Sequence, residues 1–100
     1  MKFEWDKEKN KANIRKHGFD LADAQELFLG TAPLLVTYDS RVDYGEERWK
    51  GIGLLCGVLV VAVVFAEREN DTIRIISLRK ADALERKEYE AEIKNRLGQG

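Results

Sequence analysis

The sequence has one cysteine, one histidine and one proline in 100 residues, and these scarcities exclude several classes of protein. A single cysteine, Cys56, cannot form an internal disulfide, and we expect it to be a small buried apolar residue. His17 and Cys56 lie far apart in the sequence and do not supply the ligand cluster that zinc or iron requires. No glycine loop of a phosphate-binding type is present either. The sequence therefore predicts neither a metal site nor a cofactor.

Long apolar runs and an excess of positive charge are also missing. The apolar block from Ile52 to Ala66 is shorter than the roughly 20 residues that span a bilayer, and glycines interrupt it. No leader of charged, apolar and small residues opens the chain, so we expect a cytoplasmic protein without membrane contact. The net charge of −1 excludes an overall basic nucleic-acid binder, and any such activity must come from a local patch.

The sequence does contain enough apolar residues for one core. With 44% hydrophobic and 35% charged residues, the chain is predicted to form a single compact domain over residues 1–100. The run Val58–Ala66 is apolar at odd and even positions alike, which predicts an interior strand covered on both faces. The turn residues Asn70 and Asp71 then lead to a second β-branched strand, Thr72–Ser77, followed by the cations Arg79 and Lys80.

Capping residues indicate where the helices begin and end. Three helices are predicted: Lys7–His17 between Asp6 and Gly18, a second from Asp20 to Gly30, and a last one from Asp82 to about Arg96. In the last helix Glu85 stands at the third position, where a carboxylate completes a capping box. We expect this helix to be anchored by its apolar residues, Leu84, Ala91, Ile93 and Leu97.

The remaining segments alternate apolar and polar residues or are rich in β-branched residues, and both patterns predict strands. These are Phe3–Trp5, Leu34–Tyr38 and Glu47–Leu55, with a polar loop over residues 39–46 and a turn at Cys56-Gly57. Consecutive strands joined by short turns predict an α+β fold, with a mostly antiparallel sheet of about four to five strands packed with helices.

The candidates for chemistry are cations and hydrogen-bonding groups. They are His17, Arg48, Arg74, Arg79, Lys80 and Tyr89, with Glu47 and Glu85. Guanidinium groups bind phosphate oxygens in a fork and can stabilise transition-state charge without a metal. Such a set suits RNA cleavage in which the ribose 2′-hydroxyl attacks the adjacent phosphate. A row on the first helix, Lys9, Asn13, Lys16 and His17, lies on one face.

Each candidate also has a purely structural explanation. His17 can bond the carbonyls at its own helix end, and Glu47 and Arg48 can form an ordinary cross-strand ion pair. Tyr89 can be a packing residue with a solvated hydroxyl, and the lysine row can be a solvated helix side. Trp5 and Trp49 could stack a base, although a core role is the simpler one.

Four segments together resemble the BrnT family of toxins. They are Phe3-Glu4-Trp5-Asp6 continuing through Lys9, Asn13, Lys16, His17 and Gly18; Glu47-Arg48-Trp49 followed by Gly53; Arg74-Ile75-Ile76-Ser77-x-Arg79-Lys80-Ala81; and Glu85-Arg86-x-x-Tyr89. The resemblance covers nearly the whole chain. Each motif alone is weak, and their occurrence in the right order is specific.

The resemblance implies a RelE/ParE-like ribonuclease fold and a toxin of a type II toxin-antitoxin system that cuts RNA and halts translation. It implies metal-independent endoribonuclease activity with a cyclic-phosphate product. It also implies a BrnA-like ribbon-helix-helix antitoxin in an oligomeric complex that contacts DNA only through the antitoxin. The implied catalytic residues are His17, Glu47, Arg48, Arg79, Lys80 and Tyr89, and the implied RNA-binding residues are Lys9, Asn13, Lys16 and Arg74.

A second reading belongs to another class of protein. The same basic face could bind an acidic protein without catalysis, or the chain could be an inactive toxin that acts as a co-repressor in a DNA-binding complex. Binding without RNA turnover would distinguish these from a nuclease.

Overall fold

The computed structural model describes residues 1–39 and 45–98. Its elements are β1 (Lys2–Glu4), α1 (Lys7–His17), the 3₁₀ helix η1 (Leu21–Ala24), α2 (Gln25–Leu29), β2 (Leu35–Tyr38), β3 (Trp49–Leu55), β4 (Leu59–Arg68), β5 (Thr72–Lys80) and α3 (Ala83–Gly98). The predicted α+β class and element order are confirmed, although the second helix begins with a 3₁₀ turn. Most of the polar loop predicted over residues 39–46 lies outside the described residues.

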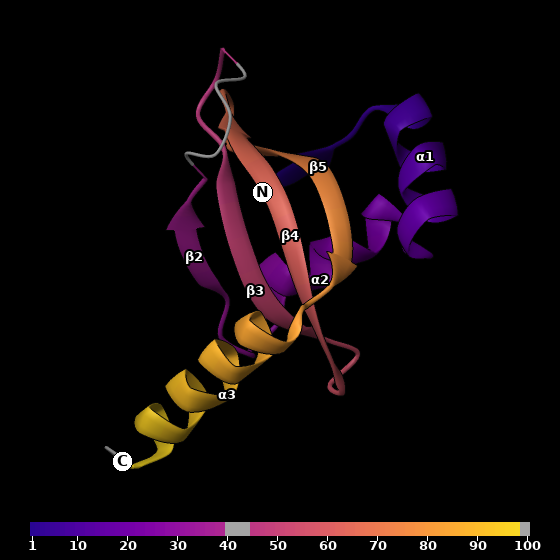
Figure 1. Cartoon of the computed structure of the whole chain (residues 1–100). Coiled ribbons are helices and arrows are strands. Elements are labelled where there is room, and N and C mark those ends of the chain that lie inside the picture. The colour runs from indigo at the N-terminus through magenta and orange to yellow at the C-terminus, as the bar shows by residue number, and fades with distance from the viewer. Residues whose placement is uncertain (40–44, 99–100) are drawn as a thin grey trace.

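The sheet has the strand order β1-β5-β4-β3-β2 (Figure 1). Only β1 and β5 are parallel, and the other neighbours are antiparallel. The apolar run predicted to be an interior strand is β4, the middle strand. Its residues from Val61 to Val63 and its pair Phe65-Ala66 are buried, so both faces are covered as predicted.

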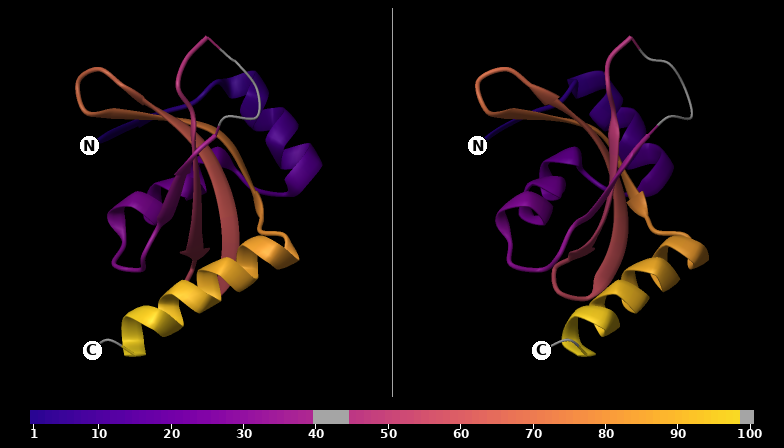
Figure 2. Two further views of the ribbon diagram at one scale, coloured as in Figure 1. Left: turned by 60° about the vertical axis from the view of Figure 1, so that its left-hand side comes forward. Right: turned by 90° about the vertical axis from the view of Figure 1, so that its left-hand side faces the viewer.

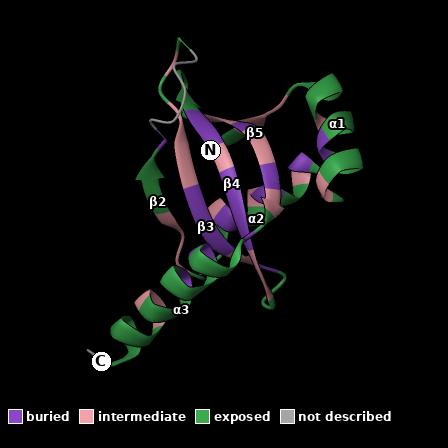
Figure 3. Cartoon of the chain, viewed as in Figure 1, coloured by how far each residue is buried: buried purple, intermediate pink, exposed green. Residues whose placement is uncertain are grey.

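Helices lie on both faces of the sheet. The segment η1–α2 covers one face, α1 flanks the sheet beside β5, and α3 crosses the opposite face at one end (Figures 1 and 2). The larger core lies under η1 and α2, where Leu21 and Leu27 meet Val61, Val63 and Phe65 (Figure 3). Burial of these side chains supplies most of the driving force for folding.

Two glycines of β3 make room for this core. A Cβ atom on Gly51 would lie 2.9 Å from Cδ1 of Leu34, and one on Gly53 would lie 3.0 Å from both Leu27 and Leu34. Both distances are shorter than a normal carbon–carbon contact. The Gly-x-Gly pattern is therefore a packing feature, which lets two leucines approach the strand backbone.

The two predicted hairpin turns are confirmed. Cys56 and Gly57 have φ values of 54° and 73°, and Asn70 and Asp71 have φ values of 62° and 56°. Two consecutive residues at positive φ match the twist of antiparallel strands. The prediction that Cys56 is buried was wrong: it is exposed in its turn, where its backbone N–H donates to Glu26.

The predicted helix caps are also confirmed. Asp6 accepts a hydrogen bond from the Lys9 N–H at 2.9 Å, and Gly18 closes α1 in the left-handed conformation. At α3 the Asp82 carboxylate accepts from the Glu85 N–H at 2.8 Å, and Glu85 accepts from the Asp82 N–H at 3.0 Å. This reciprocal pair is the capping box predicted from the sequence.

The predicted anchors of α3 were largely wrong. Leu84 and Leu97 are 67% and 78% exposed, and Ala91 is exposed as well, whereas Glu85 and Tyr89 are buried and Ile93 is half-buried. These three residues follow the i, i+4, i+8 spacing of one helix face. The helix therefore packs on the sheet through Glu85, Tyr89 and Ile93, and a hydrophobic pattern does not reveal the contribution of Glu85. Among the described residues, no helix is long and apolar enough to cross a membrane.

Asn13 joins α1 to the sheet. Strand β1 pairs only with Thr72–Arg74, so the outer edge of β5 beyond that point borders α1 (Figure 1). There the buried Asn13 amide donates to the Leu78 carbonyl at 2.9 Å and accepts from the Leu78 N–H at 3.2 Å. It also donates to the carbonyl of Phe19 at 2.9 Å. The side chain therefore replaces the backbone of a missing strand neighbour.

Replacing Asn13 should destabilise the whole domain. In Asn13→Ala the buried N–H and carbonyl of Leu78 lose their partner, and we expect a loss of about 2 to 4 kcal/mol in the free energy of unfolding. Urea unfolding followed by circular dichroism measures this. Asn95→Ala, at an exposed position of α3, should change stability by less than about 0.5 kcal/mol and is the matched control. Equal stability of the two variants would contradict the assigned role of Asn13.

Candidate functional site

The face of the sheet opposite η1 and α2 carries several cations from neighbouring strands. Directly opposed residues of antiparallel strands share a face, and Arg74 opposes Ala66 of β4 while Arg79 opposes Ala62. Lys50 of β3 opposes Val64 between them, and Arg48 stands two residues before Lys50, which places it on the same face. We call Arg48, Lys50, Arg74 and Arg79 the cationic face; small β4 residues form its floor.

The centre of this face is a buried ion-pair network around Glu85. The Arg79 guanidinium donates to both carboxylate oxygens of Glu85, at 2.7 and 2.9 Å, and the Lys50 ammonium donates to one of them at 3.0 Å. Glu85 is only 4% exposed. These hydrogen bonds, with Arg79 the largest contributor, lower the pKa of Glu85 from 4.5 to about 2. The network joins β3, β5 and the first turn of α3.

The other two arginines of the cationic face are also paired. Arg74 donates to Glu4 of β1 at 2.7 Å, and Nε of Arg48 lies 3.7 Å from Glu46. The sequence predicted that these arginines lie close together, and in the structure they lie on one face of the sheet. It differs in giving each arginine a carboxylate neighbour, which reduces the net positive charge of the face.

A crevice of about 280 Å³ lies beside this face, between α1 and the edge of β5. Its walls are the predicted row Lys9, Asn13, Lys16 and His17 on α1, together with Ala12 and with Ile76 and Ser77 of β5. The row therefore shares one helix face, as predicted. The side-chain amide of Asn13 is hydrogen-bonded to the backbone of Phe19 and Leu78, so it fixes α1 against β5 and is not free for a ligand.

His17 is influenced by charges from two segments. Partial burial lowers its pKa below the usual 6.5, and the positive charges of Lys16 and Arg79 lower the pKa further. Ser77, which is on the same face of β5 as Arg79, lines the crevice with His17, so the crevice lies next to the cationic face. At pH 7 the imidazole is mostly neutral and able to accept a proton.

Two predicted catalytic residues do not lie on the cationic face. Glu47 is exposed just before β3, and the carboxylate near Arg48 belongs to Glu46 instead. Lys80 follows Arg79 in β5, and strand alternation turns it to the opposite face. The sequence patterns indicated which residue types could act, but not the face of the sheet on which each side chain lies.

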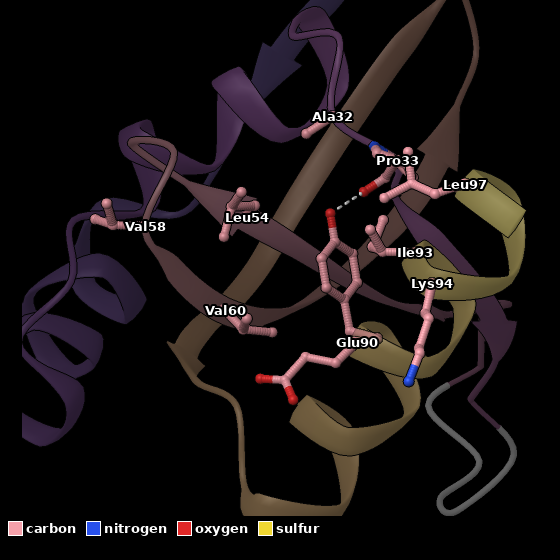
Figure 4. Close-up of a pocket in the computed structure, with 10 residues that line it drawn as sticks. Ala32, Pro33, Leu54, Val58, Val60, Glu90, Ile93, Lys94 and Leu97 are labelled. Carbon is pink, nitrogen blue, oxygen red and sulfur yellow. Dashed lines mark hydrogen bonds between the residues drawn. The ribbon is translucent and has the colours of Figure 1, made fainter.

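Tyr89 lies in an apolar groove, away from solvent. Its ring is buried and its hydroxyl donates to the Pro33 carbonyl at 2.9 Å (Figure 4). The groove has a volume of about 530 Å³ and runs between α3 and the β3–β4 hairpin, lined mainly by Leu54, Val60, Ile93 and Leu97. In the structure Tyr89 is therefore a packing residue, which was the structural explanation considered in the sequence analysis.

Lys50 was missed by the sequence analysis. Its ammonium reaches Glu85 across the face of β4, and its side chain is 27% exposed. The available signal was its position two residues after Arg48 in a strand, which puts both side chains on one face. Within the described parts of the chain, no three His, Cys, Asp or Glu side chains gather closely enough to hold a metal ion.

The Glu85 network should make stability depend on acid pH. Because the folded pKa of about 2 lies below the ordinary 4.5, the stabilisation is complete above pH 4.5 and is lost as the pH falls toward 2. With about 1.4 kcal/mol for each pKa unit, it amounts to about 3 kcal/mol. Wild type should exceed Glu85→Gln by about 3 kcal/mol near neutral pH and by less than about 1 kcal/mol at pH 2.

Urea unfolding at both pH values measures this difference. Glu92→Gln is the control, because Glu92 forms an exposed ion pair with Arg96 on the same helix. Exposed pairs contribute little, so this variant should match wild type at both pH values. A constant difference between wild type and Glu85→Gln across the pH range would contradict the assigned ionisation.

The comparisons with protein families and with solved structures give the same family. The sequence model of one family, described as the ribonuclease toxin BrnT of type II toxin-antitoxin systems, matches residues 5–85. A comparison with curated proteins gives no match. Among solved structures, the crystal structure of the Brucella abortus ribonuclease toxin BrnT is similar, with a TM-score of 0.63 and 35% sequence identity. The similarity covers 82% of this chain and 97% of that chain. The chain belongs to the BrnT family of ribonuclease toxins of type II toxin-antitoxin systems.

Proposed function

We propose that this chain is a metal-independent endoribonuclease that cleaves RNA between the cationic face and the α1–β5 crevice, and thereby inhibits translation. The observation that carries the proposal is the position of Ser77, which lines the α1–β5 crevice together with His17 and lies on the same face of β5 as Arg79. A base and a guanidinium from segments 62 residues apart in sequence are thus brought to neighbouring positions beside β5. These are the two groups that cleavage by an RNA 2′-hydroxyl requires.

In this mechanism His17 accepts the proton of the ribose 2′-hydroxyl. The 2′-oxygen attacks the adjacent phosphorus, the bond from phosphorus to the 5′-oxygen breaks, and that oxygen takes a proton from a water molecule. The proton held by His17 is then released to the hydroxide that remains. The products are a 2′,3′-cyclic phosphate and a 5′-hydroxyl end. Arg79 and Arg48 stabilise the extra negative charge on the phosphate oxygens in the transition state.

The remaining cations have a binding role in this proposal. Lys9 and Lys16 on the rim of the crevice, and Arg74 at the edge of the cationic face, contact the RNA backbone. Glu47, Lys80 and Tyr89 receive no catalytic role because of where their side chains lie. Asn13 acts by fixing α1 against β5.

Membership of a type II toxin-antitoxin family implies an antitoxin partner. We propose that it is a BrnA-like ribbon-helix-helix protein, which covers the cationic face in the cytoplasm and gives the oligomeric complex its contact with DNA. The RelE-like relationship of the fold stays a prediction.

One observation favours the alternative function, a non-catalytic co-repressor. Each of the three arginines of the cationic face has a carboxylate neighbour, so a phosphate must bind beside an existing ion pair. An inactive toxin would bind its partner protein through these residues without turning over RNA.

Substitution of Arg79 distinguishes the two functions. In bacteria, expression of wild type should stop growth and shorten RNA, and Arg79→Ala should do neither. In vitro, Arg79→Lys keeps a charge opposite Glu85 and so preserves the fold. It should reduce the cleavage rate by about 100- to 1,000-fold, because an ammonium cannot reproduce the guanidinium fork.

Arg86→Ala is the control, at an exposed position of α3 outside the site, and it should cleave at the wild-type rate. Cleavage should persist with a chelator, and a 2′-deoxy nucleotide at the scissile position should abolish it. Binding to RNA with no turnover by wild type would support the co-repressor instead. Loss of cleavage on adding the chelator would contradict the metal-independent chemistry.

The pH dependence of cleavage should report on His17. Because the pKa of His17 is lowered, the rate should rise with pH and reach half its maximum below pH 6.5. Lys16→Met removes one of the charges that lower this pKa and should move the midpoint upward. His17→Gln should lose about 100-fold in rate together with this limb of the profile. An unchanged limb in His17→Gln would assign the proton transfer to another group.

A further inference from the structure

Glu85 is the most extensively bonded carboxylate of the cationic face. It accepts two hydrogen bonds from Arg79, one from Lys50 and one from the backbone N–H of Asp82. A carboxylate offers about four acceptor positions, and these bonds occupy them. Its side chain is only 6% exposed, against 27% for Lys50 and 28% for Arg79. The two cations thus reach solvent and the carboxylate behind them does not.

The strand geometry explains what Glu85 contributes. Lys50 is on β3 and Arg79 is on β5, and β4 lies between them. Strands two places apart are separated by about 10 Å, so the two long side chains have no intrinsic reason to converge. The small Ala62, which opposes Arg79 on β4, leaves space above the strand. Glu85, in the first turn of α3, accepts hydrogen bonds from both cations and so joins them at one carboxylate.

Held side chains are better catalysts than mobile ones. Free Lys and Arg side chains each carry about 2 kcal/mol of rotamer entropy, which a substrate must otherwise remove on binding. A charge that is already in position needs no reorganisation when negative charge develops on the phosphate. A fully bonded carboxylate that remains ionised is itself a poor proton acceptor, so a direct catalytic role for Glu85 does not follow from this geometry.

We propose that Glu85 is a positioning residue that fixes the Arg79 guanidinium and the Lys50 ammonium as a single clamp for the scissile phosphate. The proposal adds Lys50 to the phosphate-binding groups and rests on the nuclease function proposed above. Because Glu85 is the third residue of α3, the clamp exists only while the first turn of α3 is docked on the sheet.

The kinetics of Glu85→Gln on an RNA oligonucleotide test the proposal. The substitution removes one negative charge from the face, so ground-state attraction for RNA should not weaken. KM should stay the same or fall, and the salt dependence of binding to an all-2′-deoxy analogue should become steeper. In contrast, kcat should fall at least tenfold, because the cations lose their fixed positions. A merely structural effect would lower kcat only in proportion to the loss of folded protein.

Two further variants separate positioning from folding. Lys50→Met should lower kcat in a protein whose Arg79–Glu85 pair is intact, and Lys50→Arg should restore part of it. In an Arg79→Lys background, Glu85→Gln should lower kcat by less than twofold more, since a residue that acts through Arg79 has little left to position. Circular dichroism at the assay temperature verifies that each variant is folded, and Glu92→Gln is the control with wild-type kinetics.

These experiments distinguish failure of the positioning role from failure of the proposed nuclease function. If wild type cleaves no RNA, the proposed function fails first. If wild type cleaves and folded Glu85→Gln has unchanged or higher kcat, the carboxylate merely screens the cations and the positioning role is overturned. Wild-type kcat in Lys50→Met would likewise remove Lys50 from the clamp.

Discussion

The central strand β4 has apolar side chains on both faces, and the need to cover both determines where the other elements lie. One face carries the larger residues Val61, Val63 and Phe65, and η1 and α2 cover it. The opposite face carries Ala62, Val64 and Ala66, and its two alanines leave room above the sheet. Part of that room is filled by α3, and long cationic side chains from the neighbouring strands extend over the rest.

The two faces of the sheet therefore differ in chemistry. The side under η1 and α2 is an ordinary hydrophobic core whose close packing even requires two glycines in β3. The other side has a polar layer in which arginines and lysine meet carboxylates at short distances. Buried ion pairs add little net stability over an apolar core, so stability alone does not account for this polar layer, and the phosphate binding proposed above does.

Local sequence signals predicted much of the fold. The caps Asp6, Gly18 and Asp82 fixed the ends of helices because they satisfy specific backbone groups, and the uninterrupted run in β4 could only be a central strand. The anchors of α3 were mispredicted because Glu85 docks it through ion pairs with residues 6 and 35 positions away in the sequence. Such long-range pairing leaves no periodic trace in the sequence.

The candidate site was predicted in part for the same reason. Residues near each other in one element, such as Lys9, Lys16 and His17, could be assigned to one surface from helical spacing. The register between strands could not be predicted from the sequence. This register brings Arg74 and Arg79 onto the same face as Lys50 and turns Lys80 to the other face. The family resemblance indicated which residues to consider, and the fold determined which face each side chain occupies.

The role of Asn13 also bears on the behaviour of this chain toward other chains. An uncovered strand edge offers unpaired N–H and carbonyl groups to any other extended segment, including one from a second molecule. In β5 the Leu78 groups are already occupied by an amide from α1, which lies along that edge. A single side chain thereby protects the long strand from edge-to-edge aggregation, and it does so with a residue that cannot itself propagate a sheet.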